Sequence, residues 1–109
     1  MRLDSSSIFK PLAAAALIAA VGPAAAQDSA ALRQRALAAT CANCHGTQGR
    51  AVDGAAVPGL AGMPASYMVE QLKAFKAGTR PATVMHQLAK GYSDAQIDQV
   101  AAYFAAQRK

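Results

Sequence analysis

The sequence predicts a small all-α protein with a single domain. Its 109 residues leave room for one small domain only. Apolar residues recur at helical spacing over 29–40, over 64–78 and again from residue 93 onward. No stretch of the chain makes a convincing strand. We therefore expect three to five short helices and no sheet.

The first 26 residues are predicted to be a secretory signal peptide that is cleaved. Two basic residues stand near its start, an apolar run follows over 12–21, and three alanines ending at Ala26 supply the small residues of a cleavage site. The apolar run is much shorter than the ~20 residues that span a bilayer. We therefore expect residues 27–109 to form the mature domain, in the periplasm and without a membrane span.

The composition of the mature chain argues against nucleic-acid binding and for a bound cofactor. Of the 11 basic and six acidic residues, two basic and one acidic lie in the leader, so nine and five remain. The longest run of consecutive basic residues in the mature chain is Arg108-Lys109. The sequence therefore gives no support to nucleic-acid binding. A chain of this size builds a core worth only ~3–5 kcal/mol, and this one lacks tryptophan. A large apolar cofactor would complete such a core.

Taken in order, the first mature helix is expected over 29–40, with an apolar side opposite Arg33 and Arg35, and it runs into the cysteines. Gly46 then lets the chain turn away. Further glycines mark the segment up to residue 62 as loop.

Both cysteines and one of the two histidines converge at the end of this helix, in Cys41-Ala42-Asn43-Cys44-His45. Two thiols three positions apart, followed at once by an imidazole, are the pattern for covalent attachment of c-type haem. On one helical turn the two sulfurs can reach the two vinyl groups of one porphyrin, while the histidine projects beneath the ring to hold the iron. We therefore predict one haem c, attached through Cys41 and Cys44, with His45 as an axial ligand.

Other uses of these cysteines fit less well. A disulfide or thioredoxin-like redox pair places Cys-x-x-Cys at a strand-to-helix turn, and no strand is predicted. A structural zinc site needs four ligands in a tetrahedron. The chain offers Cys41, Cys44, His45 and His86. Cys44 and His45 are neighbours, so they are poorly placed to share one ion.

Pro58 is a candidate partner of His45. A histidine that binds a metal normally donates its other ring N–H to a carbonyl or carboxylate, which fixes the tautomer. A proline stiffens the backbone around its carbonyl and has no N–H of its own. We therefore expect the carbonyl of Pro58 to accept from His45, although a plain loop proline fits the same spacing.

The second helix is predicted to open with Pro64 at its first position and to close at Gly78. Met68 lies on its apolar face, where methionine usually fills a core. An irregular connection over 79–83 follows, and then a short helical turn over 84–90 that stops at Gly91.

The last helix has the clearest start signal. Ser93 and Gln96 fit a capping box, and Asp94 adds negative charge near the helix N-terminus. The helix carries five apolar residues on one face: Ile97, Val100, Ala101, Phe104 and Ala105. We expect it to cross the first helix.

A second axial ligand has several candidates: Met63, Met68, Met85 and His86. Met85 lies about 40 residues beyond the cysteines, in a connection that can cross the other haem face. His86 is its rival, because only one of two neighbours can point at the metal. We predict Met85, and spacing alone leaves His86 open.

Four motifs resemble those of small class I cytochromes c: Cys41-Ala-Asn-Cys-His-Gly46, Pro58-Gly-Leu-Ala-Gly62, Met85-His-Gln-Leu-Ala-Lys-Gly-Tyr-Ser93 and Val100-Ala-Ala-Tyr-Phe104. The resemblance covers essentially the whole mature chain and implies His45 and Met85 as the axial ligands. Phe75-Lys-Ala-Gly78 and the run from Met85 most resemble the cytochrome subunit of flavocytochrome c sulfide dehydrogenase. Some such subunits carry two haem domains, whereas this chain has one motif.

This resemblance implies a periplasmic single-haem cytochrome that takes single electrons from the FAD of a sulfide-oxidising flavoprotein and passes them to a downstream acceptor. Such a protein is not an enzyme by itself. Tyr92 and the turn 89–91 are candidates for the surface that faces the partner. The alternatives are a diffusible carrier between respiratory complexes and a gas-binding or peroxidatic haem protein with an open sixth position.

Overall fold

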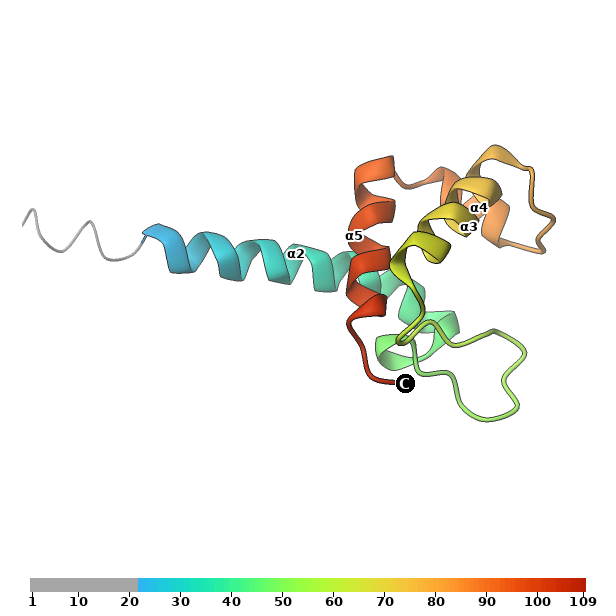
Figure 1. Cartoon of the computed structure of the whole chain (residues 1–109), viewed down its shortest axis with the longest axis horizontal. Coiled ribbons are helices and arrows are strands. Elements are labelled where there is room, and N and C mark those ends of the chain that lie inside the picture. The colour runs from blue at the N-terminus through green and yellow to red at the C-terminus, as the bar shows by residue number, and fades with distance from the viewer. Residues whose placement is uncertain (1–21) are drawn as a thin grey trace, which may run out of the picture. The chain divides into compact units, whose positions relative to one another are not determined.

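The computed structural model describes residues 22–109, and most of the predicted leader lies outside them. By its internal contacts the chain divides into residues 1–32 and 33–109, and the second unit contains the fold. Its described elements are α2 (Gly22–His45), the 3-10 helix η1 (Thr47–Gly49), α3 (Ala65–Ala77), α4 (Met85–Lys90) and α5 (Asp94–Ala105). No strand occurs within 22–109, so the all-α prediction is confirmed (Figure 1). Across the same residues, no helix has the length and apolar character needed to cross a membrane.

Helix α2 is longer than the sequence predicts. It begins at Gly22 instead of near residue 29, because the alanines at 24–26 have the highest helix propensity of all residues and continue the helix upstream. It also carries both cysteines and ends at His45. The Cys-x-x-Cys-His motif is therefore the last turn and a half of one regular helix.

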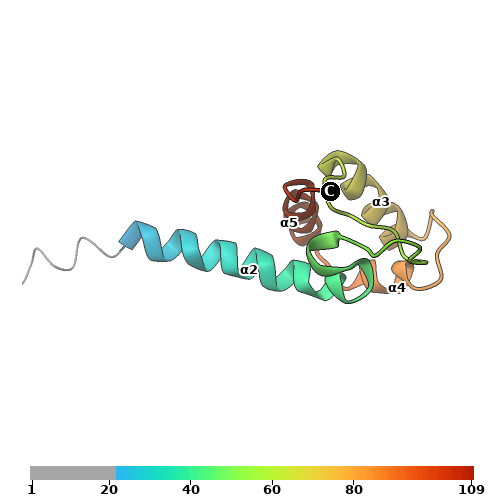
Figure 2. The same cartoon turned by 90° about the horizontal axis from the view of Figure 1, so that it is seen from below.

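The core of the second unit joins α2, α3 and α5. Ala38 of α2 and Met68 of α3 lie in one buried cluster with Val100, Ala101 and Phe104 of α5. Gln34 also donates a 3.0 Å hydrogen bond to the carbonyl of Gln99. The first and last helices therefore pack together as predicted, and α3 lies beside both α4 and α5 (Figure 2).

Helix α3 starts one residue later than predicted. Pro64 is its N-cap and not its first helical residue, and the carbonyl of Pro64 accepts from the N–H of Met68 at 3.1 Å. Gly78 caps the other end as predicted, through hydrogen bonds to the carbonyls of Ala74 and Phe75. Met68 is buried in the core, as expected for a methionine on this face.

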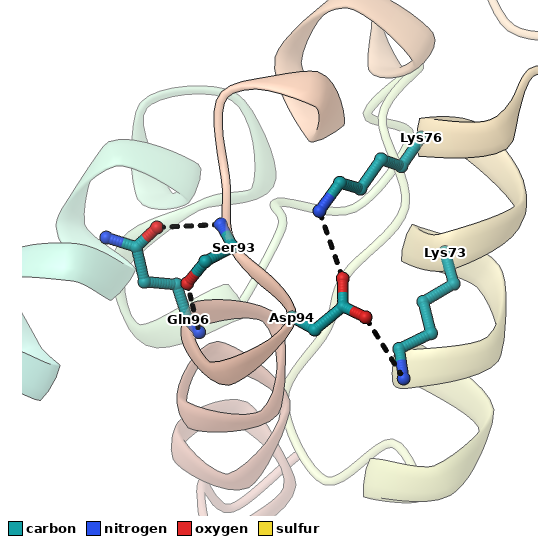
Figure 3. Close-up of polar contacts among 5 residues, drawn as sticks. All are labelled: Lys73, Lys76, Ser93, Asp94 and Gln96. Atoms are coloured by element: carbon teal, nitrogen blue, oxygen red, sulfur yellow. Dashed lines mark hydrogen bonds and ion pairs between the residues drawn. The ribbon is translucent and has the colours of Figure 1, made fainter.

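The capping box of α5 is confirmed. Gln96 N–H donates to the Ser93 hydroxyl at 3.2 Å, and Ser93 N–H donates to the Gln96 side chain at 2.9 Å (Figure 3). The structure adds a link that the sequence did not reveal. Asp94 accepts from Lys76 at 3.0 Å and lies 3.9 Å from Lys73, so α5 is tied to α3. The hydrogen bond and charge of Lys76, with the charge of Lys73, lower the pKa of the Asp94 carboxyl.

Candidate cofactor-binding site

His45 ends α2 and lies buried, with 8% of its surface exposed. Its Nδ1 is 2.6 Å from the carbonyl oxygen of Pro58. A carbonyl oxygen can only accept, so Nδ1 carries a proton, and in the neutral imidazole Nε2 keeps its lone pair. A histidine held in this tautomer is ready to bind a metal through Nε2.

A sharp turn directly after His45 brings Pro58 back to it. Gly46 has φ +88°, and a Cβ at this position would lie 2.1 Å from the carbonyl oxygen of Arg50, so only glycine fits. The turn is continued by η1, and the carbonyl of Gly49 then accepts from the N–H groups of Leu60 and Ala61, at 2.7 and 3.1 Å. The loop therefore closes on itself and holds the predicted acceptor of His45.

The two cysteines lie on the same helix, three positions apart, so their side chains project from one side of it. Neither is in a disulfide. Cys41 is half-buried against the core and Cys44 is exposed. Burial raises the pKa of the Cys41 thiol, and a hydrogen bond with Thr40 partly offsets this. Within residues 22–109 no three His, Cys, Asp or Glu side chains are placed to share a metal ion.

Met85 and His86 both lie on α4 and face different surroundings. Met85 is the first residue of the helix and not part of the irregular connection, which ends at Val84, the N-cap. Leu88 lies one turn beyond Met85 on the same side. Val84 and Leu88 are 54% and 51% exposed. Met85, itself half-buried, therefore has exposed apolar side chains near it.

Ala89, which is completely buried, lies three positions from His86 and four from Met85, so it is a helix neighbour of both. Nδ1 of His86 is buried, with no hydrogen-bond partner in the described part of the chain. Buried polar atoms are rarely left unpaired.

The turn 89–91 was expected to face a partner, and the structure corrects this for Ala89. Because Ala89 is buried, it cannot contact a partner, whereas Lys90 and Gly91 are exposed.

The described residues thus fit a covalently attached haem. The thiols project from one side of a helix, the adjacent histidine is fixed in the tautomer that a metal requires, and the exposed side chains of Val84 and Leu88 make an apolar surface near Met85. An apolar ring would cover such a surface favourably, because each Å² of apolar area removed from water contributes roughly 25 cal/mol.

Comparison with known proteins gives consistent results. A family model described as cytochrome c matches residues 30–107. The chain is 39% identical to the cytochrome subunit of sulfide dehydrogenase from Chlorobaculum tepidum, over 66% of this chain and 64% of that protein. It is 41% identical to the thiosulfate dehydrogenase electron acceptor of Thiomonas intermedia, over 62% of this chain and 31% of that protein.

Among solved structures, cytochrome c4 of Acidithiobacillus ferrooxidans matches with a TM-score of 0.57 and 41% identity, over 61% of this chain and 37% of that one. The chain therefore spans between about a third and two thirds of the length of these relatives.

Proposed function

Because the chain belongs to the cytochrome c family, whose members carry electrons with a covalently bound haem c, we propose that Cys41 and Cys44 are its attachment points and that His45 and Met85 hold the iron. When bound, the haem supplies one-electron chemistry between ferric and ferrous iron. The observation that carries the proposal is the 2.6 Å hydrogen bond from His45 to the carbonyl of Pro58. It leaves Nε2 as a ligand and keeps the imidazole from rotating.

Met85 is preferred to His86 because of the side of α4 on which it lies. Successive residues of a helix are about 100° apart, so only one of the two can face the same point. Leu88, which is 51% exposed, lies one turn from Met85 and on the opposite side of the helix from His86, while the buried Ala89 is a neighbour of both. A thioether ligand stabilises ferrous iron and raises the reduction potential, which suits a protein that accepts electrons.

We propose that residues 1–26 direct the chain to the periplasm and are then removed. The small residues up to Ala26 support this cleavage site. The mature domain, residues 27–109, would then carry a surplus of positive charge, which favours association with an acidic partner.

The proposed electron donor is the FAD of a sulfide-oxidising flavoprotein. The similarity to a cytochrome subunit of sulfide dehydrogenase supports this donor. In this assignment the flavoprotein oxidises the substrate, and the chain receives one electron at a time and passes it to a downstream acceptor. Its own residues hold the haem and form the docking surface, for which exposed Lys90 and neighbouring Gly91 are candidates.

Capture of partners from the native periplasm tests this donor. The mature holoprotein, bearing an affinity tag, is used as bait, and the flavin content of the eluate is measured. We expect bound flavin at a fixed ratio to haem, and less of it with a Lys90→Glu bait than with a Lys109→Glu bait, which carries the same change of charge. An eluate without flavin would contradict the donor and favour a diffusible carrier between respiratory complexes.

A further inference from the structure

Tyr92 connects two parts of the chain that carry different elements of the proposed site. It lies between α4 and α5, and its N–H donates to the carbonyl of Ala89 at 3.2 Å, at the end of α4. Its hydroxyl is 2.5 Å from the hydroxyl of Thr40 on α2. These two side chains are 52 residues apart in sequence. Thr40 directly precedes Cys41, so this contact reaches the end of α2 that carries Cys41, Cys44 and His45.

The direction of this hydrogen bond follows from the other contact of Thr40. The Thr40 hydroxyl lies 2.8 Å from the carbonyl oxygen of Leu37, which can only accept. The single hydroxyl hydrogen of Thr40 is therefore used, and Tyr92 must donate to Thr40. The result is a chain of two hydrogen bonds, from Tyr92 to Thr40 and from Thr40 to Leu37. Such chains strengthen one another because each bond polarises the next.

The sulfur of Cys41 is the third neighbour of the Thr40 hydroxyl, at 3.9 Å. The hydroxyl oxygen of Thr40 thus contacts both the Tyr92 hydroxyl and the sulfur of Cys41. Helix α4 begins with Met85, seven positions before Tyr92, and it packs on α3. Tyr92, two residues after the end of α4, adds a link from this part of the chain to α2, which bears Cys41, Cys44 and His45.

We propose that Tyr92, through its hydrogen bond to Thr40, is a positioning residue. It holds α4, which begins with Met85, against the last turns of α2, which carry Cys41, Cys44 and His45. This inference rests on the proposed role of Met85 as a ligand. Loss of the hydroxyl would let α4 move away more often, so that an external ligand competes with Met85 more effectively. A hydrogen bond that acted only on global stability would not change that competition.

Titration with imidazole tests the proposal. Oxidised holoprotein is titrated while the weak far-red absorption band of methionine-ligated ferric haem is followed, and the imidazole concentration at half-loss is measured. For Tyr92→Phe and for Thr40→Val we expect this concentration to fall by about twofold to tenfold, the range of one net hydrogen bond. The double variant should match Thr40→Val, since that substitution already removes the partner of the Tyr92 hydroxyl.

Two variants serve as controls. Thr40→Ser keeps the hydroxyl and should titrate like the unsubstituted protein, and so should Tyr103→Phe, which removes a tyrosine hydroxyl from α5. An unchanged midpoint in Tyr92→Phe and Thr40→Val, or an equal shift in Tyr103→Phe, would overturn the positioning role. Absence of the far-red band from the unsubstituted oxidised holoprotein would instead overturn the ligation by Met85, and the inference with it.

Discussion

Nδ1 of His45 and the carbonyl oxygen of Pro58 lie 2.6 Å apart, although the two residues are 13 positions apart in the chain. The loop between them is closed by hydrogen bonds from Leu60 and Ala61 to the carbonyl of Gly49. The acceptor of His45 is thus a backbone atom, which no side-chain substitution removes. The orientation of the imidazole depends on how firmly the loop holds that atom.

Replacement of Pro58 by alanine separates the stiffness of the proline from its carbonyl. The carbonyl remains, so we expect the Nδ1–H proton of His45 to stay protected from exchange by NMR. The unfolded chain gains freedom, so the free energy of unfolding should fall by about 0.4–1 kcal/mol in denaturant titration. Rapid exchange of the His45 proton in this variant would contradict a loop held by its other hydrogen bonds.

Gly49 and Gly54 provide a matched pair, because their φ angles are +77° and +78°. Alanine at Gly54 meets no atom within 4 Å, so it should cost only the left-handed strain of about 1–2 kcal/mol. At Gly49 the new Cβ would lie 2.7 Å from the Phe104 ring and 2.9 Å from the Ala61 nitrogen. We expect Gly49→Ala to cost about 1–3 kcal/mol more. Equal costs for the two variants in denaturant unfolding would refute this packing.

Asp94 is expected to make stability depend on pH. Lys76 and Lys73 lower the pKa of its carboxyl in the folded protein. The ionised Asp94 carboxylate therefore contributes fully to the stability of the folded protein above the ordinary carboxyl pKa. This contribution is lost as the pH falls through the lowered pKa of the folded protein. Asp94→Asn should have a lower thermal midpoint than the unsubstituted protein at pH 7, and the gap should close in strong acid.

The matched control for this effect is Asp98→Asn, which makes the same change of charge in the same helix. At pH 7 we expect Asp98→Asn to lower the thermal midpoint less than Asp94→Asn does. High salt should reduce the difference in thermal midpoint between Asp94→Asn and the unsubstituted protein, because the ion pair of Lys76 and Asp94 is exposed to solvent. A difference for Asp94→Asn that persists unchanged into strong acid would rule out the ion pairs as its source.

The processed protein has a predictable mass. We expect residues 27–109 plus one haem, because both thioether bonds form without loss of haem atoms. Intact mass spectrometry of the periplasmic protein measures this directly. A chain that still begins at Met1 would contradict the leader, and a bare chain of 83 residues would contradict the attachment.

Local signals in the sequence were sufficient for most helix ends. Ser93 and Gln96 predicted the start of α5, and Gly78 predicted the end of α3, because a cap involves only neighbouring residues. The start of α2 was placed too late, since the alanines at 24–26 belong equally well to a cleavage site and to a helix. The expected bond from His45 to Pro58 is present, and it was inferable because metal-binding histidines need such an acceptor.

Contacts between distant segments were not predictable in this way. Asp94 looked like a simple helix-start charge, and nothing local indicates that Lys76 reaches it from α3. The bond between Tyr92 and Thr40 likewise depends on how α4 and α2 pack. That Leu88 of α4 is exposed while the next residue, Ala89, is buried also depends on how α4 packs.

The ligation by Met85 is the central claim, and the far-red absorption band of the oxidised holoprotein tests it most directly. We expect the band in the unsubstituted protein and in His86→Ala, and its loss in Met85→Ala. Retention of the band in Met85→Ala, or its loss in His86→Ala alone, would contradict the assignment.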